Sequence, residues 1–426
     1  MARKHVKPRV KKRTKRPTRK KSVRKAKRHV KPDAKRRSVA RKRTGSIKVR
    51  ARARRHARRV ERVASIDQEI TAVDQKEITK FASISRTKVY VIGVGGSGSN
   101  TMTRMSELHI EGATLIATNT DAPHLENTKA QRKLLLGRTV TKGMGAGSDP
   151  SLGEEAAVES TDEIRHTVSE AQLVFVNCGL GGGTGTGAAP VIAGQSKDSG
   201  ALTVAIVTLP FTSEGKVRMK RALVGLSRLK GNTDTTIVIP NDKLLGIAPN
   251  LTLEKAFDKI DDFLANATKG IIEMITKSGM VNLDFADLKS VLQDSGYALI
   301  GMGESHAANE DKRIEKAISE TLDSPLLDID ISKSRKALVN IIGGSDLTLK
   351  EAENVFRAVS SRINDEAMLK WGARIDPKLP KNTLKIMVVM GGVGLAEYVE
   401  DSIQQSQKDA ESGKFNIDDL GLDEID

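Results

Sequence analysis

Short apolar runs alternate with longer mixed segments from residue 88 onward. Five of these runs are rich in Val, Ile and Thr, and they lie at 88–94, 114–119, 173–178, 202–209 and 235–240. Continuous apolar strands separated by helical segments indicate a parallel sheet covered by helices on both faces. We therefore predict an α/β fold whose ligands gather at the carboxyl ends of the strands, where Gly, Thr, Asn and Asp are concentrated.

A long amphipathic segment follows these strands. Apolar residues recur every three or four positions on one stripe, as in a single helix over residues 253–277: Leu253, Phe257, Ile260, Leu264, Ala267, Ile271 and Met274. Such a helix would be about 37 Å long, which suits a spine between two domains. Beyond it we expect a second, smaller α/β domain. Its predicted strands are 298–304, 336–343, 368–375 and 383–390, with a helix at 349–363.

The basic charge is concentrated at the amino terminus. Residues 1–62 hold 31 Lys or Arg and two acids, a net charge of +29, whereas the whole chain carries +18. The remainder is therefore acidic. So little aliphatic content cannot offset the entropy of ordering, and we predict that residues 1–62 are disordered. Residues 63–85 regain Ile, Val and Phe and predict a linker or short helix, while 397–426 predicts a flexible acidic tail.

The cysteine and histidine content excludes several kinds of site. Cys178 is the only cysteine, so neither an intramolecular disulfide nor a cysteine-based zinc cluster is expected, which suits a reducing cytoplasm. It lies in an apolar run, where a buried, inert thiol is the simpler interpretation. The histidines show no metal-ligand spacing, and no Ser/His/Asp set is evident. No apolar run reaches the roughly 18 residues of a membrane-spanning helix.

Two glycine-rich loops are the main candidates for a binding site. The first follows strand 88–94, and its glycines Gly93, Gly95 and Gly98 match G-x-G-x-x-G, which also fits a dinucleotide-binding turn. The second, Gly181 to Gly187, follows strand 173–178 and opens another helix. Glycines let the backbone approach a phosphate, and a helix start offers free N–H groups to its negative charge. Two such loops at one sheet edge favour a nucleoside triphosphate over a nicotinamide cofactor. The P-loop pattern is absent.

The second loop, GGGTGTG, is the signature of the tubulin and FtsZ superfamily. From about Lys88 to Gly394 the chain resembles FtsZ in every major motif, in order, and TLPF, IGMGES and SPLLDIDI resemble archaeal members. The resemblance implies a Rossmann-like parallel-sheet GTP-binding domain, a long central helix and a smaller C-terminal α/β domain. We place the GTP-binding domain at 86–250 and the C-terminal domain at 288–396. The central helix, together with the loop that follows it, occupies 251–287.

The resemblance assigns nucleotide contacts residue by residue. Phosphate contacts are implied for both glycine loops, two further loops face the nucleotide, and a charged pair contacts ribose and phosphate. The guanine pocket is implied at three positions. The full set is Gly95, Gly96, Ser97, Gly98, Ser99, Asn100, Asn119, Asp121, Gly145, Ala146, Gly147, Gly181, Gly182, Gly183, Thr184, Gly185, Thr186, Glu214, Arg218, Asn241, Phe257 and Asp261. Asn119 to Asp121 include Thr120, and Ser97 and Ser99 stand where FtsZ often has glycine.

The residues themselves support a preference for guanine. Phe257 and Asp261 are four apart on one helix and share a face. An aromatic ring can stack on the purine, while the carboxylate accepts from guanine N1–H and N2–H₂, a donor pair that adenine lacks. Alternatively, Phe257 is a core residue and Asp261 a solvated charge, which we would favour without the family match.

The segment after the long helix carries two acids. Asn282, Asp284 and Asp287 match the FtsZ synergy loop, and the resemblance implies that this loop enters the nucleotide pocket of the next subunit and orients the attacking water. Two acids with Mg²⁺ suffice for phosphoryl transfer, which needs positioning and charge stabilisation. An acid three residues before another at a helix start is also a capping arrangement. No metal ligands are assigned directly.

A divided site of this kind implies head-to-tail polymerisation, since a heterologous contact propagates into open filaments. The resemblance implies a GTPase that is active as a polymer, binds GTP and GDP, and forms the cytoplasmic cell-division ring with adaptor proteins. A filament for DNA segregation or cell shape, an NAD-dependent oxidoreductase and a structural nucleic-acid-binding protein remain alternatives. The tip FNIDDLGLDEID does not match the usual adaptor-binding peptide. Residues 1–62 are expected to bind nucleic acid or an anionic membrane surface through their positive charge.

Overall fold

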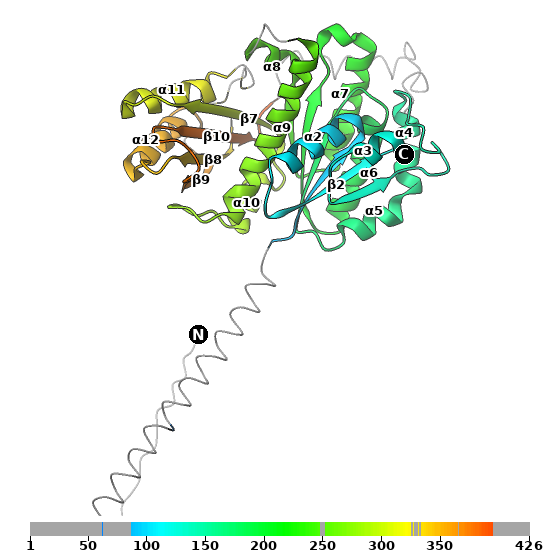
Figure 1. Cartoon of the computed structure of the whole chain (residues 1–426), viewed down its shortest axis with the longest axis horizontal. Helices are drawn as coiled ribbons and strands as arrows, with labels where there is room; N and C mark the ends of the chain where they lie inside the picture. The colour runs from blue at the N-terminus through cyan, green and yellow to red at the C-terminus, as the bar shows by residue number, and fades with distance from the viewer. Residues whose placement is uncertain are drawn as a thin grey trace, which may run out of the picture. The chain divides into compact units, whose positions relative to one another are not determined.

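A mixed ten-stranded sheet with helices on both faces forms the frame of the molecule (Figure 1). The computed structural model describes residues 62, 87–247, 252–324, 327, 331, 334–364 and 366–394. Its strands are β1 Val89–Val94, β2 Ala113–Asn119, β3 Arg132–Leu135, β4 Leu173–Gly179, β5 Leu202–Leu209, β6 Thr235–Pro240, β7 Gly296–Ser305, β8 Lys336–Gly343, β9 Met368–Ile375 and β10 Leu384–Gly391.

The helices lie between these strands in chain order. They are α2 Gly95–Glu107, α3 Ala122–Asn127, α4 Pro150–Glu159, α5 Thr161–Val168, α6 Thr184–Asp198, α7 Lys216–Gly231, α8 Asn241–Ile247, α9 Leu253–Thr276, α10 Phe285–Leu292, α11 Glu310–Leu322 and α12 Leu349–Ser360, with a 3₁₀ turn at Thr212–Glu214. The strands expected from the apolar runs are therefore present. Strand β3 and helix α8 were not expected, because both are short and weakly patterned, and the sequence reasoning did not place α11 either.

The strand order is β3-β2-β1-β4-β5-β6-β7-β10-β8-β9. From β3 to β7 neighbouring strands are parallel, so their carboxyl ends share one edge. Beyond β7 the pattern is mixed: β10 pairs antiparallel with both β7 and β8, and β8 pairs parallel with β9. The sheet runs without interruption through both predicted domains, and the expected boundary after Asp287 falls within α10.

Three apolar cores hold the helices against the sheet. Helices α2, α9 and α10 pack on one face, and this core joins residues of β1 and β4 to residues of β8 and β10. Helices α4 to α7 cover the other face of the amino-terminal strands. The second core contains Cys178, which is completely buried as expected, and this burial raises the pKa of its thiol to about 12.

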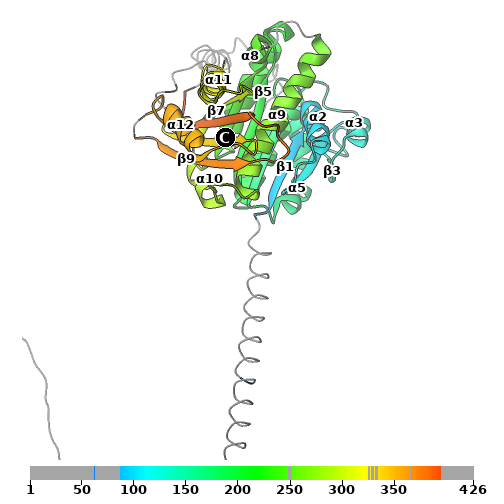
Figure 2. The ribbon, with the colours of Figure 1, turned by 60° about the vertical axis from the view of Figure 1, so that its left-hand side comes forward.

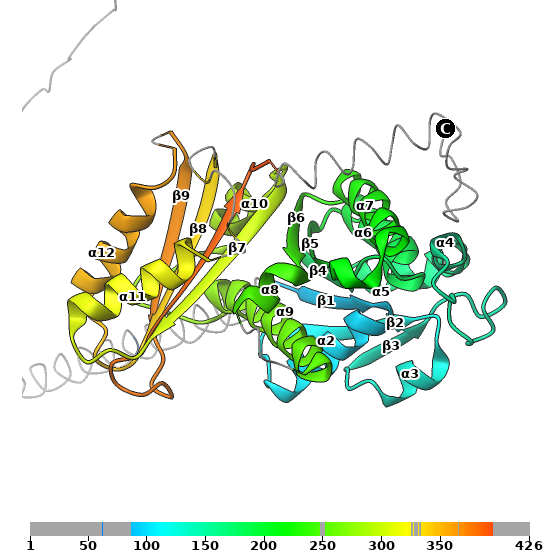
Figure 3. The ribbon, with the colours of Figure 1, turned by 90° about the horizontal axis from the view of Figure 1, so that it is seen from above.

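Helix α9 connects the two edges of the parallel strands. Its first half lies beside α2, where Thr101 Oγ1 donates to Asp261 Oδ1 at 3.1 Å. Its last residue, Thr276, packs against Gly112, just before β2 begins. Figure 1 shows α9 running from α8 to α10, and Figure 3 shows it between the amino-terminal and carboxyl-terminal strands. The helix ends one residue before the expected Lys277.

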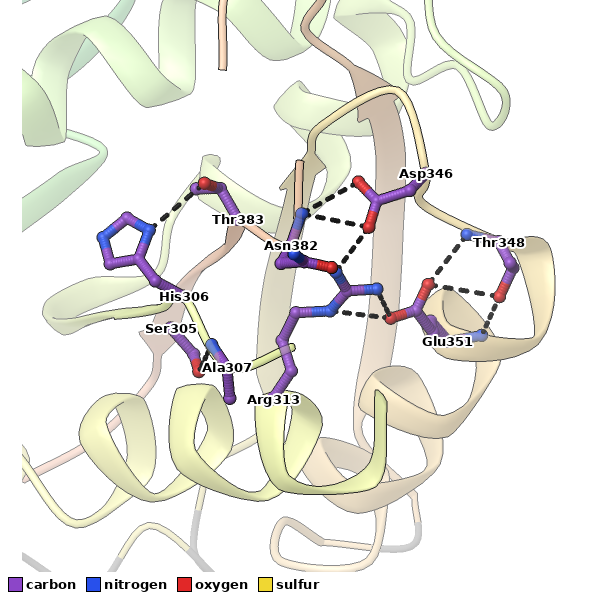
Figure 4. Close-up of polar contacts among 9 residues, drawn as sticks. All are labelled: Ser305, His306, Ala307, Arg313, Asp346, Thr348, Glu351, Asn382 and Thr383. Atoms are coloured by element: carbon purple, nitrogen blue, oxygen red, sulfur yellow. Dashed lines mark hydrogen bonds and ion pairs between the residues drawn. The ribbon is translucent and has the colours of Figure 1, made fainter. Parts of the chain in front are cut away.

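A third core and a buried ion network stabilise the carboxyl-terminal strands. Helices α11 and α12 lie on the same side of β7, β10, β8 and β9 (Figure 2). Between them, Arg313 contacts Glu351 through two guanidinium nitrogens and Asp346 Oδ2 at 2.7 Å (Figure 4). The carboxylate of Asp346 also accepts from the backbone N–H of Asn382 at 3.0 Å. One arginine thus ties two helices to the β9–β10 turn.

Several expectations fall outside the described residues. These are the order or disorder of 1–61, the linker at 63–85 and the acidic tail after residue 396. Helix α12 ends at Ser360, earlier than the expected 363. Within the described part of the chain, none of the helices combines the length and apolar character that a membrane crossing requires.

Candidate nucleotide-binding site

A cavity of about 270 Å³ opens at the carboxyl edge of the parallel strands. It is lined by Val94, Gly96, Ser97, Asn100, Gly179, Leu180, Gly182, Gly183, Thr184, Gly185, Thr208, Pro210, Glu214, Arg218, Asn241, Phe257, Ile260 and Asp261. Both glycine-rich loops contribute, so the expectation that they meet at one sheet edge is confirmed. The long helix α9 supplies a further part of the wall through Phe257, Ile260 and Asp261.

The first glycine segment is a direct strand-to-helix turn. Strand β1 ends at Val94 and α2 begins at Gly95, so Gly95 to Asn100 form the first turns of the helix instead of the expected separate loop. Gly95 makes this turn in one residue by adopting a positive φ of 73°. Val94, the residue before the helix, makes no side-chain hydrogen bond that would cap α2. The first N–H groups of α2 are therefore left to solvent or a ligand.

The second glycine segment is built on the same plan. Strand β4 leads through Gly181, with a φ of 100°, to helix α6 at Thr184, and no side chain caps α6 either. A Cβ on Gly182 would have no atom within 4 Å, because this residue faces open space at the cavity. In contrast, the Gly181 N–H donates to Thr186 Oγ1 at 2.8 Å, so fully buried Thr186 shapes the loop from inside.

Three expected contacts near α2 and β2 lie behind the cavity wall. Gly98 packs against the backbone of Asn177, and Ser99 is fully buried with an Oγ that has no partner among the described residues. Asn119 is also buried, and its Oδ1 accepts from the N–H of Thr120 at 2.9 Å. The structure thus gives Gly98, Ser99 and Asn119 packing positions rather than places on the cavity lining.

The two outer loops support the second glycine segment. Asp121 caps α3 by accepting from the His124 N–H, and Thr120 Oγ1 lies 2.7 Å from Thr184 Oγ1. The loop carrying Gly145, Ala146 and Gly147 is bonded to the Thr120 carbonyl through the Gly145 N–H at 3.1 Å. The buried Ala146 packs against Gly183. These residues border the cavity without lining it.

A charged pair stands at the cavity mouth. Glu214 Oε2 lies 3.1 Å from Arg218 Nε, one helical turn away, and Glu214 Oε1 accepts from the Phe211 N–H at 2.7 Å. Because Arg218 is half exposed, its guanidinium keeps further donors available. The pair expected to contact ribose and phosphate therefore lines the same cavity as the glycine loops.

Two other lining residues give the cavity the features of a base pocket. Phe257 is 41% exposed, and its ring meets the buried Phe211 edge-on at a centroid distance of 5.5 Å. Asn241 is only 6% exposed, yet its Oδ1 has no hydrogen-bond partner among the described residues. An exposed aromatic face and a buried amide oxygen without a partner can both be satisfied by a planar, donor-bearing ligand.

The carboxyl group of Asp261 has an unusual acidity. Burial raises its pKa from 3.8 to about 7, although the hydrogen bond from Thr101 opposes this shift. The neighbouring acids Asp258 and Asp262 raise the pKa further. A ligand that donates to this carboxylate would favour its ionised form.

Residues 279–287, which we call the acid loop, lie at the amino edge of the parallel strands, away from the cavity. Asp284 caps α10 by accepting from the Asp287 N–H at 2.8 Å, and the Asp284 N–H donates back to Asp287 at 3.4 Å. Asn282 Oδ1 accepts from the Gly279 N–H at 2.6 Å. Helix α10 then ends where β6 begins, as its Leu292 carbonyl accepts from Thr235. One chain therefore does not bring Asn282, Asp284 and Asp287 to the cavity.

Sequence reasoning missed several lining residues, of which Thr208 and Gly179 are the most informative. Both stand at the carboxyl ends of their strands, β5 and β4. The rule that ligands gather at this edge could have identified them. They were missed because neither belongs to a recognisable motif.

Comparisons with known proteins agree with this architecture. Residues 88–249 match the model of the Tubulin/FtsZ family GTPase domain, and residues 296–394 match that of the FtsZ family C-terminal domain. The chain is 51% identical over 320 residues to cell division protein FtsZ 1 of Methanocaldococcus jannaschii, covering 75% of this chain and 87% of the relative. For the same protein of Thermococcus kodakarensis the identity is 49% over 348 residues, covering 81% and 92%.

Solved structures give the same result. An empty FtsZ dimer of M. jannaschii superposes with a TM-score of 0.71 at 51% identity, covering 75% of this chain and 92% of that one. CetZ2 of Haloferax volcanii, at 22% identity and a TM-score of 0.66 over 77% of this chain and all of that one, shares the fold. The matched GTPase domain supports GTP over a nicotinamide cofactor as the ligand. The chain belongs to the FtsZ family of cell-division GTPases.

Proposed function

We propose that GTP occupies the cavity at the carboxyl edge, with its phosphates at the starts of α2 and α6 and its base between Phe257, Asn241 and Asp261. The two helix starts without side-chain caps offer N–H groups to the phosphates. The open space at Gly182 leaves room for a phosphate. The buried Asn241 Oδ1 awaits a donor, which guanine carries.

Hydrolysis would require a second copy of the chain. The observation that carries this proposal is the separation of the acids from the cavity by α9, whose 24 residues span roughly 36 Å at 1.5 Å per residue. If the α10 edge of one subunit meets the cavity of the next, Asp284 and Asp287 reach the neighbour's γ-phosphate. The contact is heterologous and repeats along a filament.

In the joined site the acids would orient the attacking water, while the helix starts and Arg218 hold the phosphates. A Mg²⁺ ion bound with the nucleotide would supply neutralisation of the phosphate charge. Among the described residues no group of three or more His, Cys, Asp or Glu could hold a metal ion. Mg²⁺ ligands from the phosphates and water are in keeping with its preferences. Release of the γ-phosphate would loosen the contact and give turnover, as a ring-forming filament at the division site needs.

A mixing experiment tests the shared site. Asp287→Ala keeps an intact cavity but loses an acid, whereas Gly182→Asp keeps both acids but places a negative charge in the phosphate space. Each variant alone should hydrolyse GTP poorly. Their mixture should regain part of the activity, because an intact cavity then meets an intact acid loop.

Two outcomes would refute the intersubunit mechanism. One is a mixture no more active than the sum of its parts while both variants still assemble with wild-type protein. The other is a turnover per molecule that stays constant as wild-type protein is diluted. Isothermal titration with GTP, ATP and NADH, each with Mg²⁺, checks the nucleotide separately.

The amino-terminal segment adds a partner to this proposal. Residues 1–62 carry a net charge of +29 without aromatic residues, so they would bind the phosphate backbone of nucleic acid through counterion release. Affinity should then fall log-linearly with salt, and removal of residues 1–62 should abolish it while GTP hydrolysis survives. Binding that ignores salt, or that persists in the truncated chain, would exclude this role. Vesicles with anionic lipids serve as the competing polyanion.

A further inference from the structure

Strand β9 holds the acid loop in place. Val281 and Ala373 exchange two backbone hydrogen bonds of 3.1 Å, which form an isolated antiparallel bridge. Gly279 packs so closely on the Ala373 carbonyl that an added Cβ would lie 2.4 Å from its oxygen. The start of the loop is therefore fixed to β9 by its backbone, three residues before Asp284.

Side chains of β9 continue this attachment on one face of the strand. Lys370 and Arg374 are four residues apart and so point to the same side. Arg374 forms an ion pair of 2.7 Å with Glu273 near the end of α9, and both side chains are nearly buried. Trp371 points to the other side and packs on Phe356 of α12. Lys370 is thus carried by a strand that is anchored on both faces.

Lys370 reaches the acid that the proposed mechanism needs. Its Nζ lies 2.8 Å from Asp287 Oδ1, while Asp287 Oδ2 accepts from the Asp284 N–H at 3.4 Å. The hydrogen bond from Lys370 holds the pKa of Asp287 below its usual range. Both oxygens of this carboxylate are therefore engaged before any neighbouring subunit arrives.

The ion pair between Lys370 and Asp287 adds little to the free energy of unfolding, so stability alone does not account for it. Lys370 and Asp287 are 39% and 30% exposed, and exposed pairs contribute about 0–1 kcal/mol. What the pair does provide is a defined rotamer for Asp287. An unpaired aspartate would rotate about two bonds, and a catalytic group misplaced by about 1 Å can cost on the order of a hundredfold in rate.

We propose that Lys370 is a positioning residue for GTP hydrolysis, which fixes the carboxylate of Asp287 in the orientation that it takes up against the neighbour's γ-phosphate. This inference rests on the proposed intersubunit function. It assigns to β9, in the carboxyl-terminal part of one subunit, a share in the chemistry at the cavity of the next.

The test uses Lys370→Met, which keeps the aliphatic stem, and Lys370→Arg, which keeps the charge. The chain offers a matched control, because Lys385 pairs with Glu304 at the same 2.8 Å and at 40% and 39% exposure on the adjoining strands β10 and β7. Lys385→Met therefore removes an equivalent ion pair without touching the acid loop. The full chain is assayed for GTP affinity, for kcat in fully assembled protein, and for the protein concentration at which turnover begins.

We expect Lys370→Met to lower kcat by roughly tenfold to a hundredfold with unchanged GTP affinity and thermal midpoint. Lys370→Arg should restore most of the rate, and Lys385→Met should behave as wild type. A wild-type kcat in Lys370→Met, or equal losses in Lys370→Met and Lys385→Met, would overturn the proposal. So would an effect confined to the protein concentration at which turnover begins, since that would identify a contact between subunits instead of a positioning role.

Asp287→Ala separates this proposal from the one on which it rests. If Asp287→Ala is inactive while Lys370→Met keeps its rate, only the role of Lys370 is wrong. If Asp287→Ala hydrolyses GTP normally, the proposed function itself fails.

Discussion

The helices that begin at the cavity and the helices of the carboxyl-terminal part satisfy their first N–H groups in opposite ways. Around the cavity, helices α2, α6, α7 and α9 all begin without a hydrogen bond from a capping side chain. In the carboxyl-terminal part, α10, α11 and α12 each begin with one, from Asp284, Asn309 and Thr348. The latter part also pairs its buried arginine, Arg313, with two acids.

This difference separates a region prepared for a ligand from one that is complete by itself. Donors without partners and an unpartnered amide oxygen cost free energy until a ligand satisfies them. Caps and paired charges hold the carboxyl-terminal strands as a firm support for the acid loop.

The largest effect on stability is expected in the carboxyl-terminal part, where the buried polar groups are paired with one another. Arg313→Met leaves the fully buried Glu351 without its counter-charge, and breaking such a pair costs about 3–5 kcal/mol of unfolding free energy. Denaturant unfolding of the full chain measures the loss. The control is Lys316→Met on the same helix, whose pair with Glu320 is exposed and should cost less than about 1 kcal/mol. Equal losses in both variants would show that the buried network contributes no more to the free energy of unfolding than an exposed ion pair.

A smaller effect is expected on the ligand-binding side. Asp261→Ala removes the acceptor proposed for guanine, so GTP binding should weaken by about 1.5–3 kcal/mol, as for a hydrogen bond to a charged group. The preference for GTP over ATP should narrow with it. Asn266→Ala, an exposed residue farther along the same helix, serves as control and should leave the preference unchanged. Titration calorimetry with both nucleotides would reject the role of Asp261 if the GTP/ATP ratio were unaltered.

The smallest effect is a dependence of GTP affinity on pH, which we expect at the cavity and which has no counterpart in the carboxyl-terminal part. The free protein protonates Asp261 below a pKa of about 7, and GTP is expected to select the ionised form. Affinity should therefore hold above pH 7 and fall by up to about tenfold per unit below it.

Asp261→Ala should lack this dependence. In the carboxyl-terminal part, Arg313 lowers the pKa of Asp346, so the stability this acid contributes is present above 3.8 and is lost only as the pH falls through the lowered value. Unfolding measured from about pH 8 to about pH 6 should show no loss from this group. A GTP affinity independent of pH in the wild-type chain would contradict the assignment.

Local patterns determined the elements and the ligand edge. Apolar runs predicted nine of the strands because buried parallel strands are continuously apolar, and the stripe of α9 fixed its face. Glycine loops after strands predicted the cavity, because the turn and the phosphate approach both depend on backbone near the residue itself. The motif match of GGGTGTG then gave the family.

Only the tertiary structure decided which residues meet. It inserted β10 between β7 and β8, placed Ser99 and Asn119 behind the cavity wall, and separated Asp287 from the cavity by the length of α9. It also joined Lys370 to Asp287 across 83 positions of the chain. No local pattern encodes such contacts, because they depend on strand order and on the packing of helices that are far apart in sequence.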